Sequence, residues 1–336
     1  KISDGAMSGL TLANGELNLY HIKIIGKYAL ADSNVSKVIF EDIAELPQGL
    51  FEGCTSFTEF TGLEKITAVG DRAFYGCKSL TSIALPVATT IGDEAFYQCS
   101  ALTSVAATEV TEVGDSAFNG ANVVNINFPN LSIIGAEAFA NNDEARTVVL
   151  GAVTQMGNEV FKNCSEITSV TFGDGTTTVG AYAFYSAKRN SALTTVILPD
   201  SVESIGDYAF YNLVAVKSIN LSNVTTIGNY SFYNTLSLAN VDIANVQTIG
   251  DYAFASSAAR TVTLTGVRQI GKHAFDGAPL TEVTFGDNLA YIGDYAFADC
   301  SAKGFTSVTV PASVTYMGVG VFYNCSYLNS AVVRAG

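Results

Sequence analysis

A six-residue pattern, Ile-Gly-Asp-x-Ala-Phe, returns along this chain at nearly constant spacing, as at Ile91–Phe96 and Ile249–Phe254. The residue four positions after its glycine is Phe every time except once, where it is Leu30. The anchor position holds Gly, with one Pro, at 26, 47, 70, 92, 114, 135, 157, 180, 206, 228, 250, 271, 293 and 318, which makes fourteen anchors 21 to 26 residues apart. A fixed period of this length is the signature of a solenoid built from stacked coils.

A second constant element lies between the anchors, an apolar alternation such as Leu80-x-x-Ile83-x-Leu85. Apolar residues two apart, with Thr or Ser between them, predict one short strand with a buried and an exposed face. A further short extended piece leads into each Ile-Gly. The Asp-x-Ala-Phe segment is interpreted as a turn or a single helical turn that the Asp caps. One repeat of about 22 residues buries too few side chains to fold alone, so successive repeats must stack.

The sequence therefore predicts a leucine-rich-repeat-like solenoid of about fourteen stacked repeats, with mostly short parallel strands, as one continuous domain over residues 20–336. Residues 1–19 are interpreted as an N-terminal hairpin cap and the first strand, because Asn14-Gly15 between apolar alternations is typical of a type I′ turn. Pro47 replaces one anchor glycine, so we expect either that these glycines serve close packing more than a positive φ, or that the second coil is locally irregular.

The ends and the longer coils carry weaker expectations. Repeat arrays need a polar cap, and the last strand, Ala331–Val333, has none, so we expect the array to continue or its last coil to be used in a contact. Two coils carry extra residues, Lys188-Arg189-Asn190 and Ala302-Lys303-Gly304. Such insertions leave a solenoid as loops on one face, and they are either binding loops or neutral bumps.

Charge and hydropathy exclude several classes of function. The formal net charge is −14, whereas binding to nucleic acid phosphates or to an anionic membrane surface needs clustered Lys and Arg. No apolar run approaches the 18 residues of a membrane-spanning segment. We therefore expect no nucleic acid partner and no membrane span.

Cysteines and histidines are the residues that would carry chemistry here, and neither forms a recognisable site. Six cysteines each lie three residues after the repeat Phe, where other coils have residues such as Ala121 or Thr235, so we expect a column of small buried side chains with free thiols. Only His21 and His273 are present, far apart and without a fixed nucleophile or carboxylate nearby. The sequence predicts no catalytic residues, no metal site, no cofactor and no enzyme activity.

The positions of the tyrosines are the remaining sequence feature that indicates a binding surface. They recur two and five positions after the anchor glycine, and positions three apart share a face if the segment makes a helical turn. The candidate partner-binding strip consists of Tyr182, Tyr185, Tyr208, Tyr211, Tyr230, Tyr233 and Tyr252. Tyr gives a large contact area for protein or glycan at low entropic cost. The alternative interpretation is that the stacked rings only seal one edge of the coils.

The exposed strand face is the second candidate surface. Its outward positions are rich in Thr, Ser and Asn and nearly free of charge, for example Thr103/Ser104, Thr194/Thr195 and Thr261/Thr263. Such a face offers many weak polar contacts to a protein partner. The alternative is that Thr is present only because it is a good strand residue.

The repeat unit resembles the BspA-type, or Treponema pallidum-type, leucine-rich repeat. The resemblance is clearest in Lys78–Pro86 followed by Ile91–Cys99, and it runs from about residue 17 to 333. It implies a right-handed solenoid in an exported protein at the bacterial cell surface or outside the cell, which binds host or bacterial proteins in adhesion. On this basis the partner is an extracellular or cell-surface protein, or else a glycan, and we expect a monomer. A passive spacer that holds another domain away from the cell stays open as an alternative.

Overall fold

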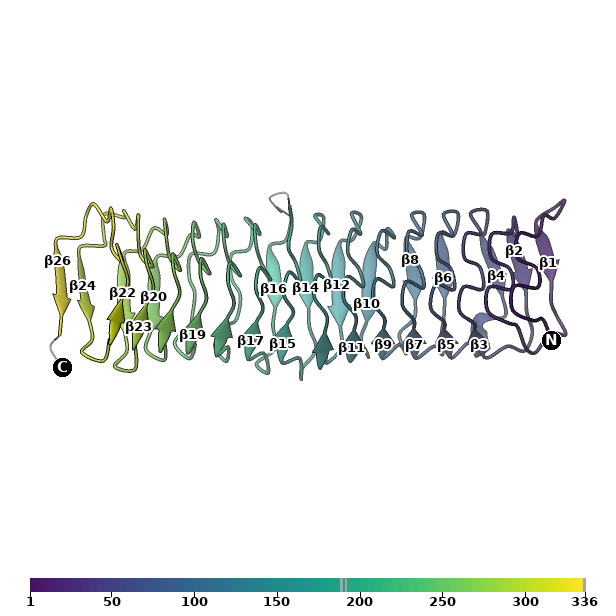
Figure 1. Cartoon of the computed structure of the whole chain (residues 1–336), viewed down its shortest axis with the longest axis horizontal. Coiled ribbons are helices and arrows are strands. Elements are labelled where there is room, and N and C mark those ends of the chain that lie inside the picture. Colours follow the sequence, from purple (N-terminus) through teal and green to yellow (C-terminus); the bar gives the residue numbers. More distant parts are fainter. Residues whose placement is uncertain (188–189, 191, 335–336) are drawn as a thin grey trace. The chain divides into compact units, whose positions relative to one another are not determined.

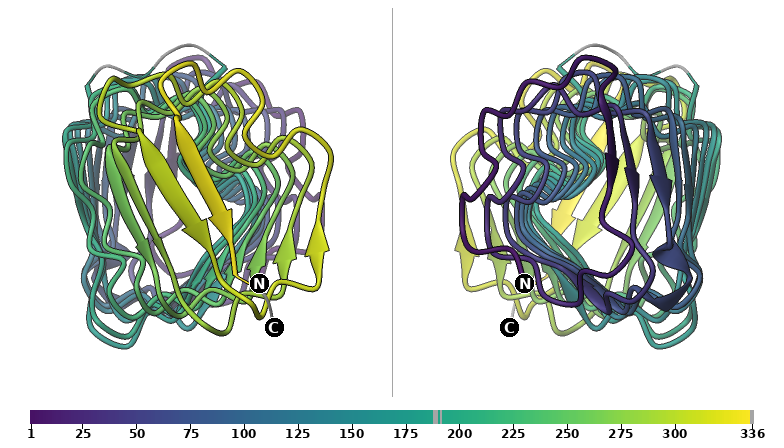
Figure 2. Two further views of the ribbon diagram at one scale, coloured as in Figure 1. Left: turned by 90° about the vertical axis from the view of Figure 1, so that its left-hand side faces the viewer. Right: turned by 90° about the vertical axis from the view of Figure 1, so that its right-hand side faces the viewer.

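The structure is a computed structural model that describes residues 1–187, 190 and 192–334. It divides into two compact units, residues 1–167 and 168–336, which we call unit 1 and unit 2, and each is a parallel β-solenoid (Figure 1). Most coils have a long strand, a short strand and a turn segment, and the end views show the long and short strands on different walls of the coil (Figure 2). We call these the long-strand wall, the short-strand wall and the turn wall.

The long-strand wall of unit 1 follows the predicted apolar alternation. Its strands are β1 (Glu16–Asn18), β2 (Lys37–Ile39), β4 (Glu59–Thr61), β6 (Ser82–Ala84), β8 (Ser104–Ala106), β10 (Asn125–Phe128) and β12 (Thr147–Leu150). Repeat equivalents pair in parallel, as Val38 does with Phe60. The described ladder is interrupted between β4 and β6 and between β8 and β10, which belong to different sheets.

The long-strand wall of unit 2 is built in the same way. Its strands are β14 (Ser169–Thr171), β16 (Thr195–Ile197), β20 (Thr261–Leu264), β22 (Glu282–Phe285), β24 (Ser307–Val310) and β26 (Ser330–Val333). Two intervening coils contribute isolated bridges, Thr195–Ser218 and Asn240–Thr261. In the described part of this unit the ladder breaks between the coils of Ser218 and Asn240, and again between β22 and β24.

Two-residue strands form a continuous parallel sheet on the short-strand wall of each unit. In unit 1 they are β3 (Glu45–Leu46), β5 (Ala68–Val69), β7 (Thr90–Ile91), β9 (Glu112–Val113), β11 (Ile133–Ile134) and β13 (Gln155–Met156). In unit 2 they are β15 (Thr178–Val179), β17 (Ser204–Ile205), β18 (Thr226–Ile227), β19 (Thr248–Ile249), β21 (Gln269–Ile270), β23 (Tyr291–Ile292) and β25 (Tyr316–Met317). One 3-10 turn, η1 (Leu63–Lys65), is the only helical element of the described ranges.

The turn wall is made of turns, and the single helical turns allowed by the sequence are not formed there. Successive N–H groups alternate in direction: that of Tyr208 donates to the Asn229 carbonyl of the next coil (2.8 Å), and that of Tyr211 donates to the Tyr208 carbonyl of its own coil (3.2 Å). A helical turn would bond its N–H groups within one coil. The alternation instead bonds the turn wall from coil to coil, and this requires a left-handed residue such as Tyr208 (φ 56°) in each turn.

The anchor glycines serve close packing, as predicted. A Cβ on Gly228 would lie 2.5 Å from Asp207 Oδ1 and 2.6 Å from the Asp207 nitrogen in the preceding coil, and the φ of Gly228 is not positive. The expectation that the Asp after the anchor caps its own turn is wrong. Asp207 Oδ1 instead accepts the N–H of Asn229 in the next coil at 2.7 Å. Because coils are so close at the glycine, the neighbouring amide is the nearest donor that the side chain can reach.

The repeat phenylalanines form a buried column in each unit, as predicted. In unit 2 the rings of Phe210, Phe232, Phe254 and Phe275 follow one another at centroid distances of 5.3, 5.0 and 5.3 Å. All four side chains are excluded from solvent almost completely. This column is the centre of the core and the main apolar link between successive coils.

The cysteines are buried and free, as predicted. Each thiol also has a partner that the sequence did not reveal: Cys99 Sγ donates to the Phe74 carbonyl of the preceding coil at 3.0 Å, and Cys164 Sγ to that of Phe139 at 3.1 Å. Burial raises the pKa of Cys99 and Cys164 to about 12. Both thiols therefore stay protonated and act as small core donors, without the thiolate character of a reactive cysteine.

One position in the core of unit 2 holds a polar side chain where the neighbouring coils hold apolar ones. Ser231 is fully buried at the place where adjacent coils have Ala209 and Ala253, and its hydroxyl has no hydrogen-bond partner in the described chain. An unpaired buried hydroxyl costs about 1–3 kcal/mol. We expect Ser231→Ala to raise the free energy of unfolding, measured by urea denaturation, by about 1 kcal/mol. The control is Ala253→Ser, which places a hydroxyl at the equivalent position and should lower the free energy of unfolding. If Ser231→Ala left the free energy of unfolding unchanged or lowered it, the buried hydroxyl would not be destabilising.

Residues 1–19 do not form the predicted hairpin. Alternate N–H groups bond to the following coil, as that of Met7 does to the Ala29 carbonyl (2.9 Å), and β1 pairs in parallel with β2. The segment is thus a first coil with the same pairing as the others, because the open edge of the next coil offers a full set of backbone partners. The single continuous domain over residues 20–336 stays a prediction.

The first of the two predicted insertions is described only in part, because Lys188 and Arg189 lie outside the described residues.

Candidate protein-binding surface

The tyrosine strip consists of two stacked columns in unit 2. Tyr182, Tyr208, Tyr230 and Tyr252 form the first column, with ring centroids 4.6, 4.7 and 4.6 Å apart and planes within 9° of parallel. Tyr185, Tyr211 and Tyr233 form the second, with centroids 5.2 and 5.1 Å apart. Rings of the two columns lie 5.5 to 5.8 Å apart within a coil. The structure therefore brings all seven predicted tyrosines together.

The turn wall produces this arrangement through its backbone. The first-column residues all have left-handed φ values of 54° to 56°, which turn them to the same side as the residue three positions later. Coils repeat at about 4.8 Å, and this spacing suits stacked aromatic rings. The shared face was predicted from a helical turn, so the conclusion is confirmed although its reason was wrong.

Stacking decides which part of each tyrosine can contact a partner. All seven side chains are half-buried, and inside a column both ring faces are covered by the neighbouring rings. No hydroxyl of the strip has a hydrogen-bond partner in the part of the chain that the structure describes. Burial raises the pKa of Tyr208, Tyr211 and Tyr230. The strip thus offers ring edges and neutral hydroxyl groups, which can both donate and accept.

Two residues beyond the predicted strip extend its first column. The His273 ring stacks 4.5 Å from Tyr252 and 5.1 Å from Tyr295. The signal for His273 was available in the sequence, since it also lies two positions after an anchor glycine. The expectation that no carboxylate lies near the histidines was wrong, because His273 Nδ1 is 2.7 Å from Asp276 Oδ2 and His21 Nδ1 is 3.8 Å from Glu41 Oε2.

The turn wall of unit 1 differs in chemistry from that of unit 2. The first-column position holds Arg72 and Glu94, and Arg72 forms ion pairs with Glu94 and with Glu52 (2.7 Å) while its guanidinium lies 4.1 Å from the Tyr75 ring centroid. A stacked pair, Tyr75 and Tyr97, is present at 5.0 Å. Unit 1 therefore carries a charged ladder and three tyrosines, Tyr28, Tyr75 and Tyr97, where unit 2 carries the extended strip.

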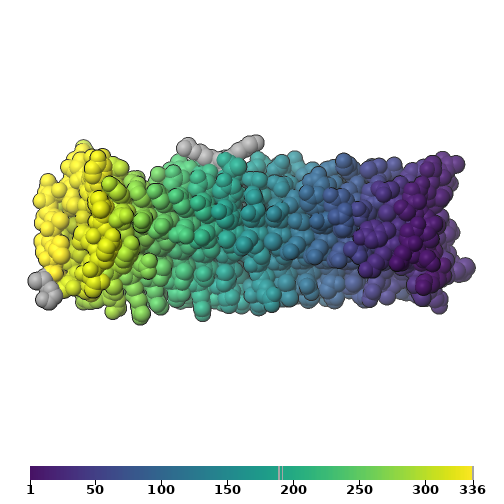
Figure 3. Space-filling model, viewed as in Figure 1, coloured from purple at the N-terminus to yellow at the C-terminus, as the bar shows by residue number. Residues whose placement is uncertain are grey.

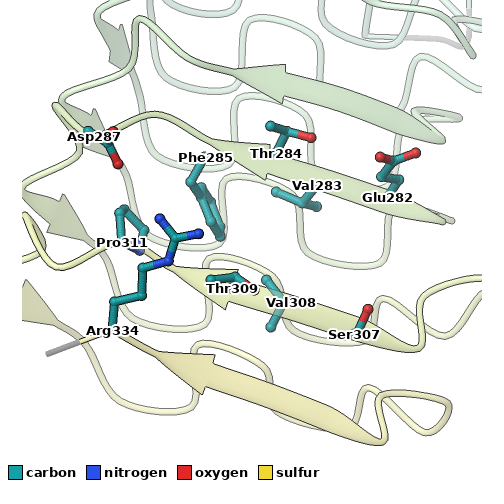
Figure 4. A pocket seen from close by; sticks show the side chains of 10 residues that line it. All are labelled: Glu282, Val283, Thr284, Phe285, Asp287, Ser307, Val308, Thr309, Pro311 and Arg334. Atoms are coloured by element: carbon teal, nitrogen blue, oxygen red, sulfur yellow. The ribbon is translucent and has the colours of Figure 1, made fainter.

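The long-strand wall has the polar exposed surface that the sequence predicted. Thr103, Ser104, Thr261 and Thr263 are all exposed. Where the ladder breaks between β22 and β24, a hollow of about 310 Å³ opens, and Figure 4 shows the residues that line it, among them Phe285 and Arg334. Figure 3 shows the side chains that reach the surface in the view of Figure 1, coloured along the sequence. This wall is a second, more polar surface for contacts.

Two kinds of site are absent from the described residues. No group of three or more His, Cys, Asp or Glu side chains in these ranges is placed to hold a metal ion. No described helix has the length and apolar character needed to cross a bilayer.

Comparison with known proteins adds the following findings. The family described as BspA type leucine rich repeat region matches in six overlapping copies, over residues 1–103, 23–146, 73–190, 132–260, 187–303 and 247–335. No curated protein sequence matches significantly. Among solved structures, a leucine-rich repeat protein from Bacteroides ovatus is similar, with a TM-score of 0.61 and 21% identity over 90% of this chain and 83% of that one.

Two further solved structures are less similar in shape. A leucine rich cell surface protein from Faecalibacterium prausnitzii has a TM-score of 0.46 and 24% identity, over 81% of this chain and 84% of that one. The leucine rich repeat protein of T. pallidum has a TM-score of 0.41 and 26% identity, over 45% of this chain and 72% of that one.

Proposed function

The chain belongs to the BspA-type leucine-rich repeat family, and we propose that it is a non-enzymatic module that binds an extracellular or cell-surface protein through the tyrosine strip. The observation that carries the proposal is the row of tyrosine hydroxyls without partners in the described chain, repeated from coil to coil in unit 2. Tyr is enriched in protein interfaces because a rigid ring adds both contact area and a hydrogen-bonding group.

The covered ring faces favour a protein partner over a glycan. Aromatic rings that hold sugars do so with a free face against the sugar ring. In the strip, the rings of Tyr208 and Tyr230 are stacked on both sides by neighbours 4.6 to 4.7 Å away. Ring edges and hydroxyl groups suit the mixed apolar and polar surface of a protein.

Binding is tested with purified protein on immobilised extracellular-matrix extract and on intact bacterial cells. We expect saturable binding by the unchanged protein. The variant with Tyr208, Tyr211, Tyr230 and Tyr233 all changed to Phe keeps the stacked rings and loses four hydroxyl groups. We expect at least about a tenfold weaker affinity, since each lost interfacial hydrogen bond costs about 0.5–1.5 kcal/mol.

The matched control changes four stacked tyrosines outside the strip to Phe, namely Tyr75, Tyr97, Tyr291 and Tyr316. This control should bind like the unchanged protein. Equal binding by both variants would defeat the assignment of the strip. Absence of binding to every matrix and cell preparation would leave the spacer function, and binding on a glycan array that the strip variant loses would leave the glycan function.

The location of the protein is part of the proposal. We place it at the bacterial cell surface or outside the cell, as the family resemblance implies. Protease treatment of intact cells tests this, since a surface protein is degraded while a cytoplasmic marker stays whole. Survival of the protein on intact cells would contradict the location.

A further inference from the structure

The long-strand wall of unit 1 is open between β4 and β6. Most Cα–Cα distances between these strands exceed 8 Å, whereas hydrogen-bonded parallel strands lie about 4.8 Å apart. The short strands of the same two coils stay paired, with Ala68 opposite Thr90. The coils are therefore held together on one wall and separated on the other. We call the space between β4 and β6 the β4–β6 slot.

Two residues of the β4 coil explain the slot. Phe60 occupies the interior position that Val38 and Ile83 hold in the neighbouring coils, and Gly62 occupies the position of Phe40 and Leu85. The Phe60 ring packs toward the preceding coil, 5.0 Å from that of Phe40. Gly62 lies so close to the same coil that a Cβ would be 2.3 Å from the Phe40 carbonyl oxygen. The β4 coil is thus drawn toward β2, and the apolar side chain that would fill the space beside β6 is missing.

Backbone groups on both edges of the slot lack a strand partner. The Thr81 carbonyl and the Leu85 N–H bond to the β8 coil, so the intervening Ser82 and Ala84 direct their backbone groups to the opposite side. The backbone groups of Glu59 and Thr61 bond to the β2 coil, so the N–H and C=O groups of Phe60 point toward β6. Since β4 and β6 do not pair, the slot has two facing strand edges with free N–H and C=O groups.

The lining of the slot combines an apolar floor with an acidic rim. A hollow of about 420 Å³ is lined by Phe60, Leu63, Leu80 and Ile83, and by the carboxylates of Glu59 and Glu64, without any Lys or Arg. Of the nearby cations, Lys37 lies 3.1 Å from Glu59 and Lys65 is paired with Asp42 at 2.8 Å. Leu63, Leu80 and Ile83 are buried, whereas Phe60 is only half-buried, so Phe60 is the part of the floor that a ligand can contact.

We propose that the β4–β6 slot binds an extended peptide segment that carries basic side chains, as a strand added between β4 and β6. A peptide is the ligand that offers N–H and C=O groups at strand spacing to both edges at once. Its inward side chain would cover the apolar floor, and its basic side chains would pair with Glu64 and with Glu59, which the peptide would share with Lys37. The two carboxylates disfavour an anion, and an apolar small molecule would leave the backbone groups of both edges unpaired.

The break between β22 and β24 is not equivalent. Several Cα atoms of these strands lie within 8 Å of each other, which leaves too little room for an added strand. Its rim has mixed charge, with Arg334 and Asp287 at one end and Glu282 at the other (Figure 4). Of these two breaks in the ladder, the β4–β6 slot has the larger share of Cα–Cα distances above 8 Å, and only there are the charged residues of the lining all acidic.

Peptide binding is tested by NMR on the ²H,¹⁵N-labelled protein at low salt. The probe is acetyl-Thr-Lys-Val-Lys-Thr-amide, with one apolar residue between two basic ones. We expect saturable shifts of the amide signals of Phe60, Ser82 and Ala84. The same peptide with N-methyl groups on Val and on the second Lys should bind about tenfold more weakly, because it has lost strand donors. Equal affinity of the methylated peptide would overturn the added strand.

The acidic rim is tested in the same titration. We expect the double variant Glu59→Lys and Glu64→Lys to weaken binding roughly fivefold to tenfold. The control variant Glu109→Lys and Glu112→Lys reverses two exposed carboxylates of unit 1 outside the slot and should leave the affinity unchanged. Shifts that do not saturate, that map elsewhere, or that weaken equally in both variants would overturn the proposal. The tyrosine strip lies in unit 2 and is untouched, so failure of one proposal does not imply failure of the other.

Discussion

Changing Phe254 to Ala is expected to lower the free energy of unfolding by about 3–5 kcal/mol. Its ring is fully buried between those of Phe232 and Phe275, at 5.0 and 5.3 Å. The change leaves a cavity in the middle of the column, and the coils cannot close it because hydrogen bonds on the other walls fix their spacing. Urea denaturation followed by far-UV circular dichroism measures the loss.

Two control variants separate the cavity from other causes. Leu236→Ala removes an apolar side chain that is 46% exposed in the same unit, and it should change stability by less than about 0.5 kcal/mol. Phe254→Leu should cost less than the Ala variant, since Leu30 occupies the equivalent position in the coil of unit 1 that follows the first. A loss below about 1 kcal/mol for Phe254→Ala would show that the column is not the core of the unit.

Changing Gly228 to Ala is expected to destabilise unit 2 by about 3 kcal/mol, at the upper end of the usual cost of overpacking. The added methyl group would lie 2.5 to 2.7 Å from Asp207 Oδ1, the Asp207 nitrogen and the Gly206 carbonyl carbon. Two of these are backbone atoms held by bonds between coils, so they cannot move without opening the ladder. Hydrogen–deuterium exchange should show faster exchange of the Asn229 and Tyr208 amides, which bridge neighbouring coils there.

Gly277 provides the matched control for this substitution. It has a positive φ of 69°, but a Cβ there would meet only Ser256 Oγ, at 3.8 Å. Gly277→Ala should therefore lower the free energy of unfolding by only about 1–2 kcal/mol, the strain of a residue with a side chain in the left-handed backbone conformation. If Gly228→Ala were no more destabilising than Gly277→Ala, close packing would not be the reason for the anchor glycines.

The candidate surface was predicted for a partly wrong reason. The period placed Tyr208, Tyr230 and Tyr252 in one column, because residues at equivalent positions of a stacked repeat must lie above one another. That this column lies beside Tyr211 and Tyr233 follows from the left-handed residue in each turn, which the sequence does not specify. Tyr is an unusual residue for a positive φ, so no local signal pointed to that backbone.

The Asp column and the first coil show a different kind of error. The local motifs predict that the side chain of Asp207 caps its own turn and that Asn14-Gly15 forms a hairpin, since both have well-known local structures. In the structure, Asp207 bonds to Asn229 and β1 pairs in parallel with β2. Local preference was overruled in both places by backbone partners about one repeat away.

The sequence by itself determined the period, the interior columns of Phe and Cys, the close contact at the anchor glycines and the membership of the tyrosine columns. These features depend only on which residues occupy equivalent positions in successive coils, and the period of the repeat defines those positions. The tertiary structure alone decided the backbone of the turn wall, the bonds of the Asp side chains and the slot beside β6. These depend on hydrogen bonds between coils and on the volume left by single departures such as Phe60 and Gly62, and such quantities exist only once the coils are stacked.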